Sequence, residues 1–190
     1  GKGFALLAGF KRALENPECA CICVLDADGQ HNPEEIPRLY DAFRETEADL
    51  VIGYRRRRYD TPRRALYSKV YNQLMRLLFG VRVRDVNFSF KLVRRRVLDA
   101  IRLSASTVFI DGQLLAEAVR GGFRIAEMPI EYTPRRVGAS SFDSLHAAWV
   151  TLVEMLRYRF SPASLATEQM LPLPHGDESA AVQLALPELE

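Results

Sequence analysis

The sequence has few cysteines and no long apolar run, and both features limit what the chain can be. Its 190 residues contain three cysteines, Cys19, Cys21 and Cys23, without histidine or cysteine partners at metal-binding spacing. We therefore expect them to be reduced packing residues, as in a cytosolic protein. No uncharged apolar run approaches the roughly 18 residues of a membrane-spanning helix, so the sequence predicts a soluble globular chain.

Two further absences lie at the ends of the sequence. The chain begins at Gly1 without a methionine or a signal-peptide pattern, so we expect upstream sequence to be missing. Residues 161–190 contain five acids, several prolines and no lysine or arginine, which predicts a disordered acidic tail after a single domain over residues 1–160.

The predicted domain is basic. It carries 26 lysines and arginines against 19 acids, an excess of seven positive charges. Such an excess favours an anionic partner, which can be a nucleotide diphosphate, a lipid phosphate, an anionic membrane surface or nucleic acid.

An apolar, β-prone run ends in two aspartates, Asp26 and Asp28, and a helix follows them. Beyond a strand end the two carboxylates can converge, and they repel one another unless a cation lies between them. Hard oxygen ligands suit Mg²⁺ or Mn²⁺, completed by water and substrate phosphates. A solvated acidic turn is the alternative. The signals that favour the metal site are Asn32 as an N-cap, Pro33 at the first helical position and Glu35 as the reciprocal capping residue.

Hydrophobic periodicity predicts an α/β chain. Leu50-Val51-Ile52 indicates a strand buried on both faces, and Pro129 places a later strand at a sheet edge or a bulge. Helix 62–79 carries its apolar residues on one side, with Gly80 as its stop; they are Leu66, Val70, Leu74, Leu77 and Leu78. The full prediction is helices over 4–14, 33–45, 62–79, 94–101, 110–120 and 143–160, and strands over 21–25, 49–54, 86–92 and 123–132.

Several charged side chains follow these elements. Lys2, between two glycines at a helix N-terminus, could contact a phosphate or serve only as part of an ordinary cap. Arg55 ends the second strand near the acidic turn and offers a donor fork for phosphate oxygens, whereas the next three arginines form a solvated loop or a nucleic-acid patch. Asp85, just ahead of a predicted strand, is a candidate base or ligand, or an ordinary turn residue.

Two elements near the end of the domain remain. The loop 134–141 is basic and contains glycine and serine, so its arginines, including Arg135, could close over a phosphate. The last helix has one apolar stripe, which packs on the body or lies on a membrane surface with Trp149 at the interface.

Six sequence blocks, spread over about residues 1–160, occur in the same order as in family 2 glycosyltransferases. The chain resembles most closely the dolichyl- or polyprenyl-phosphate hexosyltransferase branch of that family. The blocks are Gly1-Lys2-Gly3 with Ala5 and Gly9, Leu25-Asp26-Ala27-Asp28-Gly29-Gln30-His31 with Pro33, Val51-Ile52-Gly53-Tyr54-Arg55, Asp85 before Phe88-Ser89-Phe90-Lys91-Leu92, Glu127-Met128-Pro129-Ile130, and Arg135-x-x-Gly138-x-Ser140.

The resemblance implies a fold and a reaction. The fold is GT-A-like (Rossmann-type), a mostly parallel sheet flanked by helices, here without the first strands. The reaction moves a hexose, with inversion, from a nucleotide diphosphate sugar to a polyprenyl phosphate or related acceptor and uses Mg²⁺ or Mn²⁺. The implied partners are the nucleotide sugar, the lipid phosphate and a peripheral contact with the cytoplasmic face of a membrane, with no nucleic acid.

The same resemblance implies roles for individual residues. Asp26, Asp28 and Gln30 match the metal and diphosphate triad, and Asp85 matches the acidic residue on the acceptor side. An acceptor that is already a phosphate anion needs no general base, but an alcohol would, and Asp85 is then the candidate. The phosphate-contact positions are Lys2, Arg55, Arg135 and Ser140.

This sequence also departs from the family pattern. The family's first strands, which recognise base and ribose, would precede Gly1, so we expect this segment to lack base and ribose recognition. The family usually has glycine where Phe88 or Ser89 falls, lysine where Ser141 falls, and glutamate near Gln113. These changes bear on the acceptor and the detailed mechanism more than on the fold.

Two other functional classes remain open. A metal-dependent phosphoryl-transfer enzyme could use residues 25–29 as a nucleophile loop and would form a phosphorylated aspartate. A basic nucleic-acid-binding module could use residues 55–58 and 94–96, and its salt-dependent binding would survive Asp26→Ala.

Overall fold

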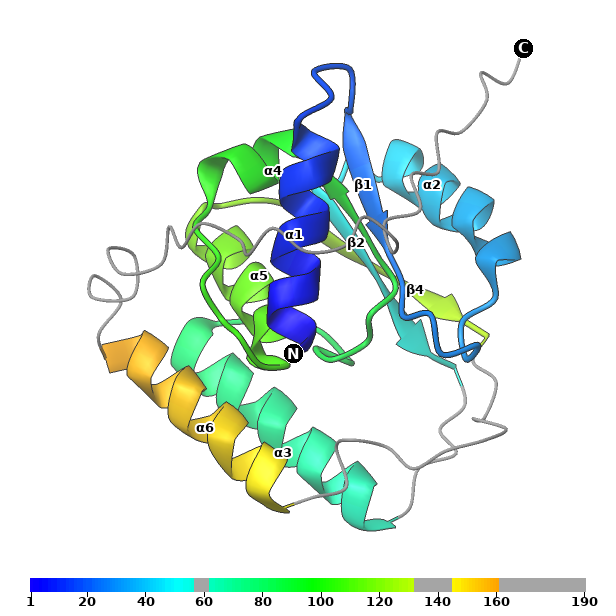
Figure 1. Cartoon of the computed structure of the whole chain (residues 1–190). Coiled ribbons are helices and arrows are strands. Elements are labelled where there is room, and N and C mark those ends of the chain that lie inside the picture. Colours follow the sequence, from blue (N-terminus) through cyan, green and yellow to red (C-terminus); the bar gives the residue numbers. More distant parts are fainter. Residues whose placement is uncertain (57–61, 132–144, 161–190) are drawn as a thin grey trace.

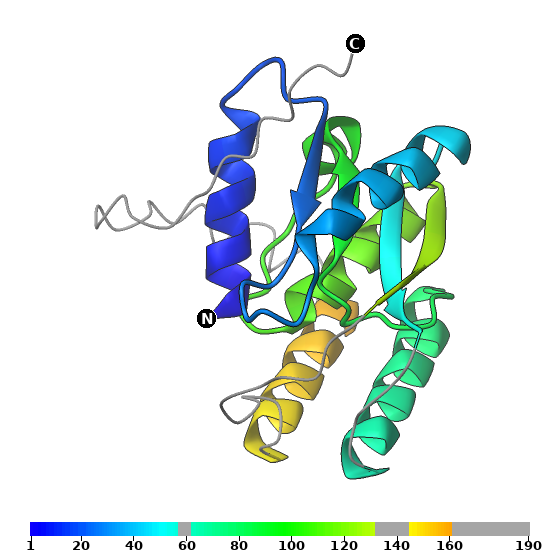
Figure 2. The ribbon, with the colours of Figure 1, turned by 90° about the vertical axis from the view of Figure 1, so that its right-hand side faces the viewer.

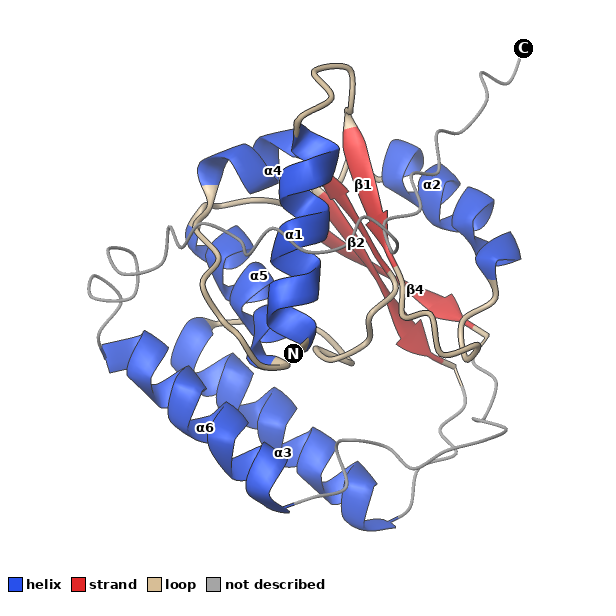
Figure 3. Ribbon diagram, in the orientation of Figure 1, coloured by secondary structure: helices blue, strands red, loops and turns tan. Residues whose placement is uncertain are grey.

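The computed structural model describes residues 1–56, 62–131 and 145–160, and shows a four-stranded sheet between helices (Figures 1 and 3). The helices are α1 (Lys2–Leu14), α2 (Ile36–Glu45), α3 (Pro62–Phe79), α4 (Arg95–Ala100), α5 (Phe109–Arg120) and α6 (Leu145–Phe160), with a 3₁₀ turn, η1 (Pro33–Glu35). The strands are β1 (Cys21–Val24), β2 (Leu50–Arg55), β3 (Lys91–Arg94) and β4 (Ile125–Ile130).

The sheet has the order β1-β3-β2-β4. Strands β1, β2 and β4 run in one direction, and β3 runs against them, so that β1–β3 and β2–β3 are antiparallel while β2–β4 is parallel. The predicted α/β class with flanking helices is confirmed. The prediction of a mostly parallel sheet holds for strand direction but not for pairing, because β3 separates β1 from β2 of the expected β-α-β unit.

The sheet divides two hydrophobic cores. Leu50 and Ile52 of β2 face a core shared with α1, α3, α5 and α6, whereas Val51 faces a second core under α2. All three side chains are fully buried, as the uninterrupted apolar run predicts. Figure 2 shows α2 on the face of the sheet opposite α1. Strand β4, which contains Pro129, forms one edge of the sheet.

The strand predicted over residues 86–92 is wrong in position. The observed strand is β3, and residues 85–90 form an irregular loop. Val86, Phe88 and Phe90 are all buried, but Val86 packs into one core and the two phenylalanines into the other. A loop inserted between two cores produces the same alternation of apolar residues as a half-buried strand.

Helix α3 has the predicted bounds and ends before Gly80, but only part of its predicted apolar side packs on the body. Leu66, Val70 and Leu77 are exposed, and Leu77 retains 70% of its accessible surface. Leu74 and Leu78 of that side pack against the core, together with Tyr71 and the fully buried Met75.

The predicted helix over 33–45 consists of η1 and α2. Asn32 is confirmed as the N-cap, because its side chain accepts a hydrogen bond from the Glu34 backbone at 3.1 Å. The Glu35 carboxylate does not return to the cap but pairs with Arg38 at 2.5 Å. The three cysteines are free. Within the described ranges, no helix combines the length and apolar character that a membrane span requires.

Candidate active site

The two aspartates of the acidic turn lie beyond the carboxyl end of β1, as predicted. Gly29, with φ +74°, permits the tight turn after them. Asp28 Oδ1 accepts a hydrogen bond from the Gln30 backbone at 3.1 Å, and Gln30 is itself buried. The Asp26 side chain is 41% exposed, so solvent ions can reach it.

Three segments distant in sequence meet at Asp26. Lys2 Nζ, at the start of α1, lies 3.4 Å from Asp26 Oδ1 and donates to Ser89 Oγ at 2.6 Å. Ser89 Oγ in turn donates to Asp26 Oδ2 at 2.6 Å. Both oxygens of the carboxylate are therefore engaged by protein groups.

A buried ion pair lies beneath this cluster. Lys91 Nζ of β3 lies 2.6 Å from Asp111 Oδ1 of α5, and each side chain is only 1% exposed. Lys91 also donates to the Phe88 carbonyl. The second oxygen of Asp111 is 2.8 Å from Lys2 Nζ, which links the buried pair to Asp26.

Burial and charge act in opposite directions on the pKa values of the two lysines. Burial lowers the pKa of Lys91, and the attraction of Asp111 opposes this. At Lys2 burial also acts downward, but the carboxylates of Asp111 and Asp26 outweigh it and raise the pKa. The Lys2 ammonium is therefore stable next to the acidic turn.

The predicted residues Arg55 and Asp85 are brought together. Arg55 Nε lies 2.8 Å from Asp85 Oδ2, and Nη2 lies 3.4 Å from Oδ1. The side chains are 9% and 2% exposed. Asp85 is therefore held as the partner of the Arg55 guanidinium.

The loop that carries Asp85 is fixed from two sides. Asn72 of α3 donates to the Arg84 carbonyl at 2.8 Å and accepts from the Val86 backbone at 3.3 Å. Glu127 of β4 accepts from the Arg84 backbone at 2.6 Å.

Loop 85–90 joins the two parts of the site. It holds Asp85 beside Arg55 and Ser89 beside Asp26. His31, just after the acidic turn, packs edge-on against Phe88 and Phe90, with ring centroids 4.9 and 5.7 Å away. Burial lowers the pKa of His31, although Asp26 and Asp28 act in the opposite direction. Arg55 and the acidic turn thus lie at the same end of the sheet, at the carboxyl ends of β2 and β1, as expected. Arg135 and Ser140 lie outside the described residues.

Sequence patterns did not identify Lys91, Ser89 or Asp111 as members of the site. Lys91 stands in an apolar stretch, and Asp111 lies in the first turn of a helix whose residues are almost all buried. A charge next to apolar residues in each of two elements is a weak signal, because β3 also carries Arg94 and α5 also carries Glu117 and Arg120.

The donor atoms fit a magnesium or manganese ion in type. Asp26 and Asp28 offer carboxylate oxygens and Gln30 an amide oxygen, the ligands that such hard cations prefer. No group of three or more histidine, cysteine or acidic side chains able to hold a metal occurs within residues 1–56, 62–131 and 145–160. A cation here would need water or substrate oxygens to complete its coordination, as magnesium sites usually do.

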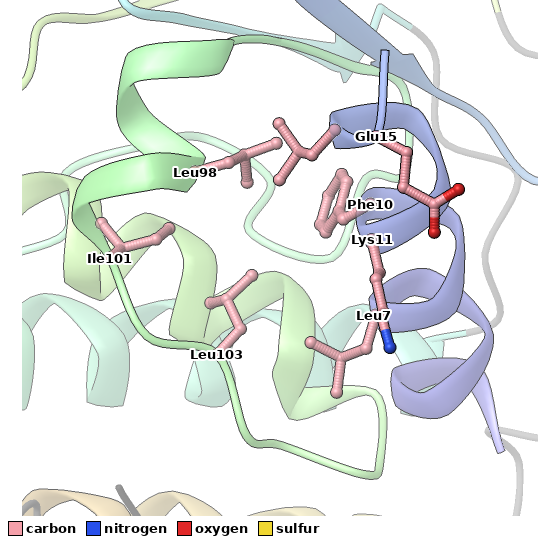
Figure 4. Close-up of a pocket in the computed structure, with 8 residues that line it drawn as sticks. Leu7, Phe10, Lys11, Glu15, Leu98, Ile101 and Leu103 are labelled. Carbon is pink, nitrogen blue, oxygen red and sulfur yellow. The ribbon is translucent and has the colours of Figure 1, made fainter. Parts of the chain in front are cut away.

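A separate groove of about 400 Å³ lies between α1 and the segment around α4 (Figure 4). It is mainly apolar, and its lining includes Phe10, Leu98 and Leu103. Lys2, Asp26, Ser89 and Asp111 do not line this groove.

Comparison with known proteins gives the family. The model described as glycosyl transferase family 2 matches residues 1–102. The polyprenol monophosphomannose synthase of Mycolicibacterium smegmatis is 38% identical over 155 residues, 75% of this chain and 56% of that protein. The undecaprenyl-phosphate mannosyltransferase of Micrococcus luteus is 34% identical over 151 residues, 75% of this chain and 61% of that protein. The chain thus spans less than two thirds of the length of these relatives.

A solved structure supports the fold. Glucosyl-3-phosphoglycerate synthase from Mycobacterium tuberculosis, in complex with phosphoglyceric acid, matches 84% of this chain and 55% of its own with a TM-score of 0.64 and 19% identity. The fold is therefore GT-A. The family match includes the acidic turn, Arg55 and the loop from Asp85 to Lys91, and the chain belongs to glycosyl transferase family 2.

Proposed function

We propose that this protein transfers a hexose from a nucleotide diphosphate sugar to a polyprenyl phosphate, with inversion at the anomeric carbon. The observation that carries the proposal is that Lys2 lies against Asp26 of the acidic turn, while Arg55, paired with Asp85, lies at the same end of the sheet, where β1 and β2 finish. Carboxylates for a cation and cationic groups for phosphates are the parts needed to bind a diphosphate leaving group.

The relatives support the acceptor class more strongly than the sugar. Their names specify mannose, 4-deoxy-4-formamido-L-arabinose and galacturonate, but in each case the partner is a polyprenyl phosphate. The proposal accordingly commits to the lipid phosphate and leaves the sugar to experiment.

The roles follow from the positions of the side chains. Asp26, Asp28 and Gln30 would hold Mg²⁺ or Mn²⁺, which neutralises charge on the departing diphosphate. Arg55 would contact phosphate, with Arg135 and Ser140 contributing from outside the described residues. The acceptor phosphate is already an anion, so no proton needs to be removed, and Asp85 would orient the Arg55 fork against which it lies.

The direct test is a transfer assay with the full-length protein. It is incubated with Mn²⁺, a polyprenyl phosphate and a panel of labelled nucleotide diphosphate sugars. We expect label from one sugar to enter the lipid fraction, and NMR of the product to show inverted anomeric configuration. Polyprenol without phosphate should accept no label. Failure of every donor would reject the function, and a phosphorylated aspartate would favour phosphoryl transfer instead.

We also infer that α3 and α6 contact a membrane surface, at its cytoplasmic face. Both helices project from the same end of the body in the two views (Figures 1 and 2). Each carries exposed apolar side chains, Leu66, Val70 and Leu77 on α3 and Trp149, Val150, Leu156 and Phe160 on α6. A lipid-linked acceptor would then reach the site from the surface on which the protein rests.

Vesicle flotation tests this contact. The double variant L77S/F160S should reduce binding to anionic vesicles by at least about tenfold, because burial of each large apolar side chain contributes roughly 1.5–3 kcal/mol. F4S is the matched control, since Phe4 is an exposed apolar residue on α1. Equal loss in F4S, or no loss in the double variant, would contradict a contact through α3 and α6.

A further inference from the structure

We propose that Lys2 is a built-in counter-ion of Asp26. When the divalent cation binds, the Lys2 ammonium leaves the Asp26 carboxylate and then pairs with a diphosphate oxygen. The inference rests on the proposed function and specifies how the cation and the nucleotide share one site. It assigns Lys2 two successive partners instead of a fixed phosphate contact.

The position of the ammonium group supports the first half. Lys2 Nζ lies between two carboxylates, 2.8 Å from Asp111 Oδ2 and 3.4 Å from Asp26 Oδ1. Its closest hydrogen-bond acceptor, Ser89 Oγ, also donates to Asp26. A positive charge at this distance already neutralises part of the Asp26 charge and repels a divalent cation that approaches it, so the two cations compete for this carboxylate.

Asp111 makes an exchange possible without loss of Lys2 from the site. Its carboxylate is buried on α5 and is held by Lys91 at 2.6 Å, so it remains in place whatever binds at Asp26. Lys2 can therefore exchange Asp26 for a diphosphate oxygen while it keeps Asp111.

The backbone of Lys2 is also fixed. A side chain on the neighbouring Gly3 would collide with the Ala105 carbonyl and with Ser106, because the first turn of α1 lies directly against this loop. The exchange thus needs only a movement of the lysine side chain, which is 26% exposed.

The proposal predicts effects of opposite sign from one substitution. In the full-length protein, K2M should bind Mn²⁺ alone about tenfold more tightly than wild type, because a competing positive charge is gone. With saturating Mn²⁺, the same variant should bind GDP or UDP, whichever wild type prefers, about tenfold more weakly. Isothermal titration calorimetry measures both affinities, and electron paramagnetic resonance checks the first.

Three further variants separate charge from structure. K2R keeps the charge and should bind Mn²⁺ as wild type does. K2Q removes the charge but keeps N–H donors for Ser89 and Asp111. It should show the same two shifts in affinity as K2M, and it replaces K2M in the test if K2M folds poorly. K11M is the matched control on the same helix, since Lys11 is exposed and lies away from the acidic turn, and should change neither affinity.

The outcomes separate this inference from the proposed function. Unchanged or weaker Mn²⁺ binding in both K2M and K2Q would overturn the counter-ion role even if wild type transfers sugar. Unchanged nucleotide binding would overturn the second role of Lys2. Opposite shifts in the two affinities, in a protein that transfers no sugar, would support the inference while the proposed function fails.

Discussion

Asp26→Asn should lower sugar transfer by at least about 1,000-fold with little change in stability. Asparagine has nearly the same shape and can still accept a hydrogen bond from Ser89. It lacks the negative charge that a divalent cation requires, and loss of electrostatic stabilisation of about 4 kcal/mol corresponds to this factor. The rate is measured as label transferred to the lipid fraction, at saturating donor and Mn²⁺.

The matched control for this variant is Asp41→Asn. Asp41 is an exposed aspartate on α2, and its replacement should leave the rate within a factor of about two, as expected for a surface site. If Asp26→Asn retained more than about a tenth of wild-type activity, the acidic turn would not be the cation site.

Asp111→Leu should destabilise the protein by about 3–5 kcal/mol, because it leaves the fully buried Lys91 without its carboxylate. Lys2 would lose its nearest carboxylate as well, but it is partly exposed and can reach water. The free energy of unfolding is measured by urea titration with circular dichroism, and the midpoint should fall without a large change in slope.

The double variant K91M/D111L tests whether the loss comes from an unpaired charge. Apolar groups of similar size on both sides should recover most of the stability, since replacing a whole buried ion pair costs far less than breaking it. Asp99→Ala is the control, because Asp99 pairs with Arg95 at 3.3 Å on the exposed side of α4 and should cost less than about 1 kcal/mol. Failure of the double variant to exceed Asp111→Leu in stability would contradict the explanation.

The sequence was most informative where local signals decide the structure. The bounds of α3 follow from Pro62 at its start and Gly80 after its end, and the N-cap at Asn32 depends on a contact two residues away. The burial of β2 follows from its unbroken apolar run. The acidic turn could be located for the same reason, since it directly follows a strand.

Contacts between distant segments could not be predicted in this way. Lys2 and Ser89 are 87 positions apart, and nothing in either segment specifies the other. Apolar spacing places five residues on one side of α3, but spacing alone does not say how far a neighbour covers that side. Leu74 and Leu78 pack against the core, whereas the residues at 66, 70 and 77 are exposed. The pairing of Arg55 with Asp85 likewise depends on tertiary structure.

The reversed direction of β3 has a consequence for how tolerant the site is to change. Because β3 runs against β1 and β2 and begins opposite the last residue of β1, the segment that enters it passes the end of the sheet where the acidic turn lies. This segment therefore carries both Asp85 and Ser89 on one short path. The register of Lys91 is fixed by its pairing with Val24 and Ile52. An added residue between Ser89 and Lys91 would therefore displace Ser89 from Asp26 and leave the lysine in place, so the length of this path matters as much as its chemistry.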